Sequence, residues 1–474
     1  MTNSSSTKSQ FLTLVTVFFF WGFLAASNGV FIPFCKSHFE LTQLQSQLID
    51  WAFYFAYFFG SLGLYLIDKI VGIDILNKIG YKMGIIYGLF FSAFGALLMI
   101  AAVNSGSYTF ILASFFVIAL GFSLQQTCAQ PFAISLGEPK SGANRLSFAG
   151  GVNSFGTTVG PIIVGYFLFG GPGGDASRVE ITSVNTMYMI LAGLFVAVAL
   201  FFMFSNLPKI THDEHIEPGL GALKYPQLVL GMVGIFIYVG VEVTIQSNMG
   251  ALLKLPEFGG YEESQIAHFI SLYWASLMIG RWTGAISVFN FSSSTNKILT
   301  VFIPFIAFAV ALGANYLGGH PISDLYPYAF CIVLFIVCYF IGEDKPAKTL
   351  LILALFGVVA MLIGLFAKGA VAKFAFISGG LACSIMWPCI FALATAGLGK
   401  YTSQGSMFLI MMILGGAIIP LVQGAIADSS IGIHQSYWIA VVCFAYLAFF
   451  AVRVKGILKA QGIDYEQEAV AAAH

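Results

Sequence analysis

The chain has 474 residues, of which 58% are hydrophobic and 9% are charged, and its formal net charge is zero. Soluble domains carry about 25% charged residues, so this composition excludes an ordinary soluble protein, and the balanced charge gives no indication of a nucleic-acid partner. A helix needs roughly 20 apolar residues to cross a bilayer core, and lipid leaves backbone polar groups unsatisfied outside helices and closed barrels. The long apolar stretches therefore predict an all-α integral membrane protein.

About 14 such stretches follow one another along the chain. The first comes after a polar, Ser/Thr-rich start and lacks a small-residue cleavage site, so we expect a retained helix and not a signal peptide. The predicted spans are residues 11–33, 45–67, 82–104, 108–132, 146–168, 184–206, 227–250, 265–288, 297–316, 325–341, 348–367, 371–396, 405–426 and 435–455.

The basic residues predict how these spans are oriented. With the N-terminus in the cytoplasm, all but five of the 21 Lys and Arg lie inside, Arg281 among them. The five outside are Lys36, Arg178, Lys254, Lys368 and Lys373. Positively charged loops stay cytoplasmic, which predicts an N-in/C-in, multi-pass protein, and the lack of a cleaved targeting segment suits the cell inner membrane.

A long polar connection after the sixth span divides the chain into two hydrophobic halves. The predicted organisation is an N-terminal six-helix bundle (1–206), a cytoplasmic linker (207–226), a C-terminal bundle (227–459) and a cytoplasmic tail (460–474).

The two halves carry related Pro residues. Pro131 and Pro388 are 257 residues apart, and Pro161 and Pro420 are 259 apart. A near-constant offset over two consecutive helices indicates a parallel duplication, although Pro is in any case common in membrane helices. Six plus six helices leave two over. We expect these two to form an inserted hairpin at about 297–341, at the periphery of the second bundle.

Two acids fall inside the predicted spans. Glu242 lies deep in the seventh span, and Asp50 lies near the outer end of the second. An acid at mid-membrane costs about 2.5–3.5 kcal/mol on insertion scales and faces a cavity or a partner. Such a carboxylate can load a proton or bind a cation, or it can hold two helices together. Glu242 is the first candidate for ion coupling and Asp50 the second.

Neutral amides and aromatic rings cluster in the same spans. Amides both donate and accept hydrogen bonds, and aromatic faces pack on sugar rings, so the set fits an uncharged, hydroxyl-rich solute. An anion fits poorly, since no Arg or Lys is expected in the middle of a span. Interhelical packing accounts for some of these amides. The predicted substrate-binding residues are Gln126, Gln130, Asn153, Gln246, Asn248 and Trp387.

The sequence gives no indication of an enzyme active site or of a metal site. The seven Cys form no CxxC pair and fall mostly in apolar segments, where small core side chains are expected. No HExxH motif, Ser/His pair or acidic cluster is present, and no ring of like charges indicates a channel. We therefore predict no enzyme, no metal site and no cofactor.

Short segments in both halves resemble the fucose/galactose/glucose permease family of the major facilitator superfamily. They include Phe18-Phe19-Phe20-Trp21-Gly22-Phe23, Gln130-Pro131-Phe132, Asn153-Ser154-Phe155-Gly156, Tyr238-Val239-Gly240, Gly280-Arg281-Trp282-Thr283-Gly284 and Ile413-Leu414-Gly415-Gly416. The resemblance implies two six-helix bundles, alternating access and uptake of a neutral hexose. Fucose–proton symporters of this family have acids where this chain has Gly29 and Gln126, which puts coupling by that route in doubt.

The sequence thus predicts a secondary active transporter that imports a neutral hexose of the glucose/galactose or fucose type, coupled to H+ or Na+. An uncoupled sugar uniporter and an exporter of another small solute on the same fold stay open as alternatives. The expected partners are a small sugar, the coupling ion and the lipid bilayer, and we expect a monomer.

Overall fold

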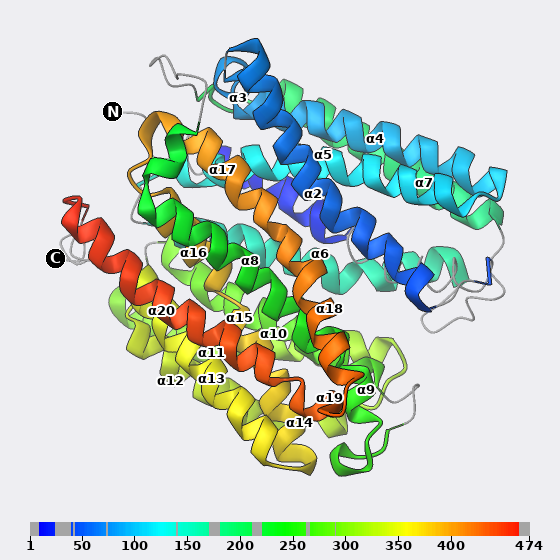
Figure 1. Ribbon diagram of the computed structural model, residues 1–474, viewed down its shortest axis with the longest axis vertical. Coiled ribbons are helices and arrows are strands. Elements are labelled where there is room, and N and C mark those ends of the chain that lie inside the picture. The colour runs from blue at the N-terminus through cyan, green and yellow to red at the C-terminus, as the bar shows by residue number, and fades with distance from the viewer. Residues whose placement is uncertain are drawn as a thin grey trace. The chain divides into compact units, whose positions relative to one another are not determined.

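The computed structural model is helical over nearly all of the chain that it describes (Figure 1). The described residues are 9–23, 39–40, 43–72, 74–138, 141–169, 181–210, 220–261, 266–289 and 291–463. The polar start (1–8), most of the predicted linker (211–219) and most of the predicted tail (464–474) lie outside them.

The helices follow the apolar stretches closely. After the helix 9–23 the longer ones are α2 (Gln43–Val71), α4 (Tyr81–Ser105), α5 (Tyr108–Ser135), α6 (Gly142–Phe169), α7 (Ile181–Phe204), α8 (Pro226–Ser247), α10 (Ala267–Ala285), α11 (Ser293–Leu317), α12 (Ala329–Gly342), α13 (Pro346–Phe366) and α20 (Trp438–Ala460). Shorter pieces are α3 (Ile75–Ile79), η3 (Gly221–Lys224), α9 (Met249–Leu253), η4 (Pro256–Phe258), η6 (Ile286–Phe289), η7 (Ser323–Tyr328), α14 (Gly369–Ile377), α15 (Gly379–Cys383), α16 (Met386–Thr395), η8 (Gly399–Tyr401), α17 (Thr402–Met411), η9 (Met412–Leu414), α18 (Gly415–Ala427) and α19 (Gly432–Gln435).

Within the described residues, 11 helical stretches are long and apolar enough to cross a membrane. The helix Ser9–Phe23 is apolar but shorter, and α6 and α10 are not among the 11. The all-helical prediction is confirmed, whereas the count of 14 spans and the N-in/C-in orientation stay predictions.

The chain's contacts divide it into two compact units. Unit 1 comprises Met1–Gly137, Phe155–Lys224 and Leu398–Met411, and unit 2 comprises Glu138–Ser154, Tyr225–Gly397 and Met412–His474. The first half of α6 therefore belongs to unit 2, and α17 belongs to unit 1. The polar connection at 207–226 divides the sequence into two hydrophobic halves. That it is also the boundary between two folded bundles stays a prediction.

Small residues bring the helices of unit 1 together. At Gly95 of α4 an added Cβ would lie 2.7 Å from the backbone nitrogen of Ile118 in α5, and the Ser92 hydroxyl donates to the Ile118 carbonyl at 3.0 Å. Helix α17 joins this unit through Ser406, which donates to the Thr127 carbonyl at 2.8 Å. Close backbone approach of this kind is how membrane helices pack without a hydrophobic driving force.

Two predicted spans of the second half of the sequence are broken where a single helix was expected. Residues 371–396 form α14, α15 and α16 in succession, and 405–426 form α17, η9 and α18. Gly380 lies against the Tyr273 carbonyl, and a Cβ there would approach it to 2.6 Å. Pro388, the third residue of α16, has no N–H and cannot bond the carbonyl four residues earlier, at Ser384. Prediction from apolar length alone does not detect such breaks.

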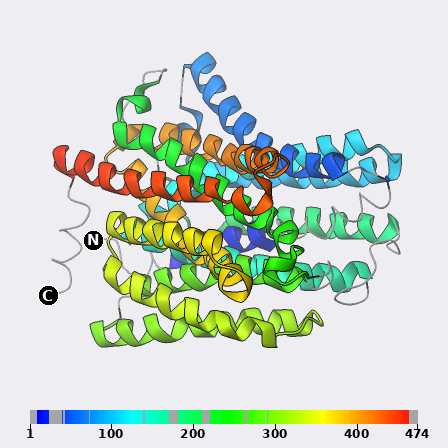
Figure 2. The ribbon, with the colours of Figure 1, turned by 60° about the horizontal axis from the view of Figure 1, so that its bottom comes forward.

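Residues of the expected hairpin, about 297–341, form α11, η7 and α12. That this pair is an insertion into a six-helix bundle stays a prediction. Figure 2 shows α13, α12 and α11 one beside the next, with α11 outermost in unit 2. Asn315 of α11 donates to the Ser271 hydroxyl of α10 at 3.0 Å, and Tyr328 shares a hydrogen bond with Ser276 of α10 at 2.7 Å. The hairpin thus packs on α10 and leaves side chains such as Phe330, 68% exposed, on its outer side.

Candidate functional site

The polar centre of unit 2 is built around Glu242 of α8. Tyr238 precedes it by four residues, which places both side chains on one face of the helix. The Tyr238 hydroxyl donates to Glu242 Oε1 at 2.6 Å. The Glu242 side chain is only 13% exposed. The sequence-based expectation that this acid would have a partner is met, since the carboxylate faces side chains inside the unit.

The second partner is Arg281, on α10. Its Nη2 lies 3.4 Å from Glu242 Oε1, and the two side chains are 14% and 13% exposed. The sequence predicts Arg281 within the eighth span (265–288), towards its cytoplasmic end, and no Arg or Lys in the middle of any span. In the structure Arg281 lies on α10 and faces the acid, and its position relative to the membrane stays a prediction. The Gly280-Arg281-Trp282 segment noted for its family resemblance was the available signal.

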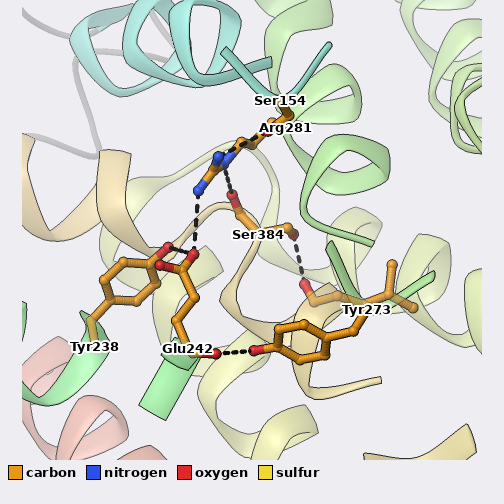
Figure 3. Close-up of polar contacts among 7 residues, drawn as sticks. Ser154, Tyr238, Glu242, Tyr273, Arg281 and Ser384 are labelled. Carbon is orange, nitrogen blue, oxygen red and sulfur yellow. Dashed lines mark hydrogen bonds and ion pairs between the residues drawn. The ribbon is translucent and has the colours of Figure 1, made fainter. Parts of the chain in front are cut away.

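Arg281 makes two further contacts, shown in Figure 3 with the acid. Its Nε donates to the Ser384 carbonyl at 3.3 Å, and its Nη1 donates to the Ser154 hydroxyl of α6 at 2.9 Å. The Ser384 carbonyl is available because Pro388 has no N–H to donate to it. A guanidinium presents its five N–H groups in a fixed planar fork, so one side chain here contacts three parts of the fold.

The first half of α6 approaches α10 through a pair of glycines. A Cβ at Gly151 would lie 2.8 Å from Cδ1 of Trp282, and one at Gly150 would lie 3.3 Å from Cδ of Arg281. The Trp282 indole donates to the Gly151 carbonyl at 3.1 Å. These two glycines therefore allow close contact between α6 and α10.

A second polar group lies further along α8. Asn248, a predicted sugar contact, donates through Nδ2 to Oε1 of Gln423 on α18. Gln423 is fully buried, and its own Nε2 has no hydrogen-bond partner among the described residues. Gln246, also predicted, is half-buried. Trp387 lies with its ring centroid 6.1 Å from that of Tyr238, so it adjoins the Glu242 group.

The predicted residues of unit 1 form a separate group. Gln126 is half-buried and donates to the Tyr57 hydroxyl at 2.8 Å. Its neighbour Gln125 is buried and accepts from the Trp21 indole at 2.7 Å, a packing role. Gln130 is also buried, at 5% exposure. Asp50 lies in α2, and its side chain is outside the described part of the structure.

Asn153 lies on α6 directly before Ser154 and is half-buried. Its neighbour Ser154 bonds the arginine of the acid pair, so a predicted sugar contact and the acid pair are one residue apart along α6. In the part of the chain that the structure describes, no group of three or more His, Cys, Asp or Glu side chains could hold a metal ion.

Curated relatives cover almost the whole chain, although no protein-family model matches it. A glucose/galactose transporter of Brucella abortus is 32% identical over 460 residues, with 95% of this chain and 96% of the relative covered. The L-fucose-proton symporter of Escherichia coli is 28% identical over 464 residues, with 93% and 92% covered.

A solved structure shares the fold. The crystal structure of FucP, a major facilitator superfamily transporter in its outward conformation, matches with a TM-score of 0.73 and 26% identity over 95% of this chain and 99% of that one. The predicted family is therefore confirmed, and the relatives are transporters and not enzymes. This chain belongs to the glucose/galactose and fucose transporter family of the major facilitator superfamily.

Proposed function

We propose that this protein is a symporter that imports a neutral hexose together with a cation, H+ or Na+, across the bacterial inner membrane by alternating access. It crosses the membrane 14 times, with both termini in the cytoplasm. The names of the relatives, glucose/galactose transporter and L-fucose-proton symporter, support the sugar substrate and the coupling.

The observation that carries the coupling is the buried carboxylate of Glu242. It is hydrogen-bonded by Tyr238 at 2.6 Å and paired with Arg281 at 3.4 Å. A carboxylate inside a membrane protein is costly unless it is compensated, and such residues mark ion pathways. Glu242 therefore binds the coupling cation, and Asp50 is the second candidate.

The sugar is bound by amides and aromatic rings. In unit 2 these are Asn153, Gln246, Asn248 and Trp387, and in unit 1 they are Gln126 and Gln130. The Asn248–Gln423 pair supports sugar binding by amides, because one carboxamide holds the other in a fixed orientation. A sugar hydroxyl can both donate a hydrogen bond to such a group and accept one from it.

One observation favours a second candidate, the uncoupled sugar uniporter. Glu242 already has a counter-charge in Arg281, and a buried ion pair can serve packing alone. The distinction is functional: a uniporter equilibrates the sugar, whereas a symporter accumulates it.

The test is uptake of labelled hexoses into proteoliposomes, with and without a sodium gradient and a proton gradient. We expect accumulation with one of the two gradients. Glu242→Gln should lose accumulation and keep sugar counterflow, because the amide retains hydrogen bonding but no longer binds a cation. Glu257→Gln, which removes an exposed acid paired with Lys368, is the matched control and should accumulate like the wild type. Accumulation that survives Glu242→Gln would remove this residue from the coupling.

A further inference from the structure

One side chain joins the proposed cation site to α6. The guanidinium of Arg281 contacts Glu242 through Nη2, the Ser384 carbonyl through Nε and the Ser154 hydroxyl through Nη1. Glu242 is on α8, Ser384 lies just before α16, and Ser154 is on the first half of α6. These three contacts use three different nitrogens of one rigid group, so a movement that breaks one of them disturbs the others.

Charge decides what a cation does at this site. With Glu242 ionised, the acid and the arginine together carry no net charge. A cation that reaches the same carboxylate, either as a proton on Oε1 or as Na+ beside it, leaves a net positive charge in a poorly solvated place. Since Arg281 and the cation compete for one carboxylate, the arginine weakens cation binding and loses its own ion partner when the cation binds.

We propose that Arg281 is a displaceable counter-ion: the coupling cation releases it from Glu242, and this release loosens the first half of α6 from α10. The proposal rests on the cation site of the proposed function. It assigns Arg281 and Ser154 as positioning residues.

The contact with α6 is specific enough to transmit this release. Besides the Ser154 bond, the Trp282 indole holds the Gly151 carbonyl at 3.1 Å, and Trp282 adjoins Arg281 in α10. Asn153, a proposed sugar contact, is next to Ser154. Cation binding at Glu242 and sugar binding at Asn153 thus act on the same stretch of α6, and two ligands that favour the same arrangement bind cooperatively.

The other titratable groups around Glu242 do not compete with the cation for its carboxylate. Tyr238 on α8 donates to the carboxylate, Tyr273 on α10 donates to the Glu242 backbone carbonyl at 2.6 Å, and Cys383 on α15 interacts electrostatically with both charges. Arg281 is therefore the charged group to change in an experiment.

The experiment measures how sugar uptake into proteoliposomes depends on the coupling cation. For Arg281→Gln the half-maximal cation concentration should fall by about tenfold or more, because the competitor is gone; with protons this moves the half-maximal pH upward by at least about one unit. Arg281→Lys keeps the charge but loses the planar fork. It should keep the cation dependence near that of the wild type, and it provides the test if the Gln variant does not fold.

Ser154→Ala isolates the α6 contact. We expect its half-maximal cation concentration to stay within about twofold of the wild type, whereas the factor by which saturating cation raises sugar affinity should fall at least about threefold. Arg453→Gln, which removes an exposed arginine of α20, is the matched control and should change neither quantity.

The outcomes separate this inference from the proposed function. No cation dependence in the wild type, or dependence that survives Glu242→Gln, refutes the proposed function at its cation site. If the wild type depends on the cation and Glu242→Gln abolishes this, an unchanged or increased cation requirement in Arg281→Gln overturns the counter-ion role. Unchanged sugar–cation cooperativity in Ser154→Ala overturns the link through α6.

Discussion

Two buried acids of unit 2 are compensated in different ways. Glu242 has a cationic partner, Arg281, at 3.4 Å. The partners of Asp344, in the turn between α12 and α13, are hydroxyl groups in the part of the chain that the structure describes: Tyr339 donates to its Oδ1 at 2.6 Å and Ser287 donates to Oδ2. Burial raises the pKa of the Asp344 carboxyl, although both hydrogen bonds oppose this. In the fold this acid therefore keeps its proton to a higher pH than it does in water.

This difference predicts a pH-dependent stability that one substitution removes. Because the folded-state pKa of Asp344 is raised above its ordinary value of 3.8, its stabilising contribution is complete below that pH and is lost as the pH rises through the raised pKa. The wild type should therefore gain thermal stability relative to Asp344→Asn as the pH is lowered from about 8 to about 4.5. The measurement is thermal unfolding of the purified protein in detergent.

The neighbouring acid Glu343 does not titrate in this pH range. Glu343 is exposed and hydrogen-bonded by Lys345 and Lys348, which hold its pKa at about 2. Asp344 has a positive φ of 58°, a conformation that Asn tolerates as well as Asp, so the substitution adds no backbone strain. Unfolding temperatures that run parallel for the two proteins across this pH range would contradict the assignment.

Sequence reasoning found the acid of the site but not its partners. Glu242 was selected because a charge inside an apolar span is costly, and that argument needs no structure. The pairing with Arg281 is not predictable from the sequence because 39 residues separate it from Glu242, and only the fold brings side chains of α8 and α10 together. The spacing of Pro388 indicates a duplication, whereas its local effect, which leaves the Ser384 carbonyl free for Arg281, depends on contacts that only the structure shows.

At the scale of helices, glycine positions decide how closely α8 and α18 pack. A Cβ at Gly415 would lie 1.8 Å from the Phe236 carbonyl oxygen, which is rigid backbone. Gly424, nine residues later on the same helix, has no atom within 4 Å of such a Cβ. The sequence alone does not distinguish these two glycines, because composition does not tell which face of a helix meets its neighbour.

These two glycines make a matched pair. Gly415→Ala should lower the free energy of unfolding by about 1–3 kcal/mol, since α8 and α18 must separate to admit the methyl group. Gly424→Ala should be neutral or stabilising by up to about 1 kcal/mol, because alanine favours the helix. Denaturant or thermal unfolding in detergent measures both, and equal effects of the two substitutions would show that α8 and α18 are not packed as described.

At the scale of the whole chain, apolar length predicts an all-helical membrane protein and the family resemblance predicts a major facilitator fold, and the match to FucP confirms both. The inserted hairpin was inferred from arithmetic: two six-helix halves leave two spans over. The structure adds that its ends meet, because Ser287 before α11 bonds Asp344 after α12. A segment whose two ends adjoin can be added to or removed from a fold without stretching the rest.

This geometry predicts that the hairpin can be deleted. Replacing residues 290–343 with a short Gly/Ser linker should leave a folded protein, because the joined ends are already neighbours and an even number of crossings is removed. Removal of α11 alone takes away one crossing and should move everything after it to the opposite side of the membrane. A C-terminal fluorescent-protein fusion, which fluoresces only in the cytoplasm, reports the side. Fluorescence should persist in the full deletion and be lost in the single-helix deletion, and sugar counterflow should survive only in the former. If the full deletion is inserted with its C-terminus inside but has no counterflow, the hairpin is part of the transport core and not a peripheral addition.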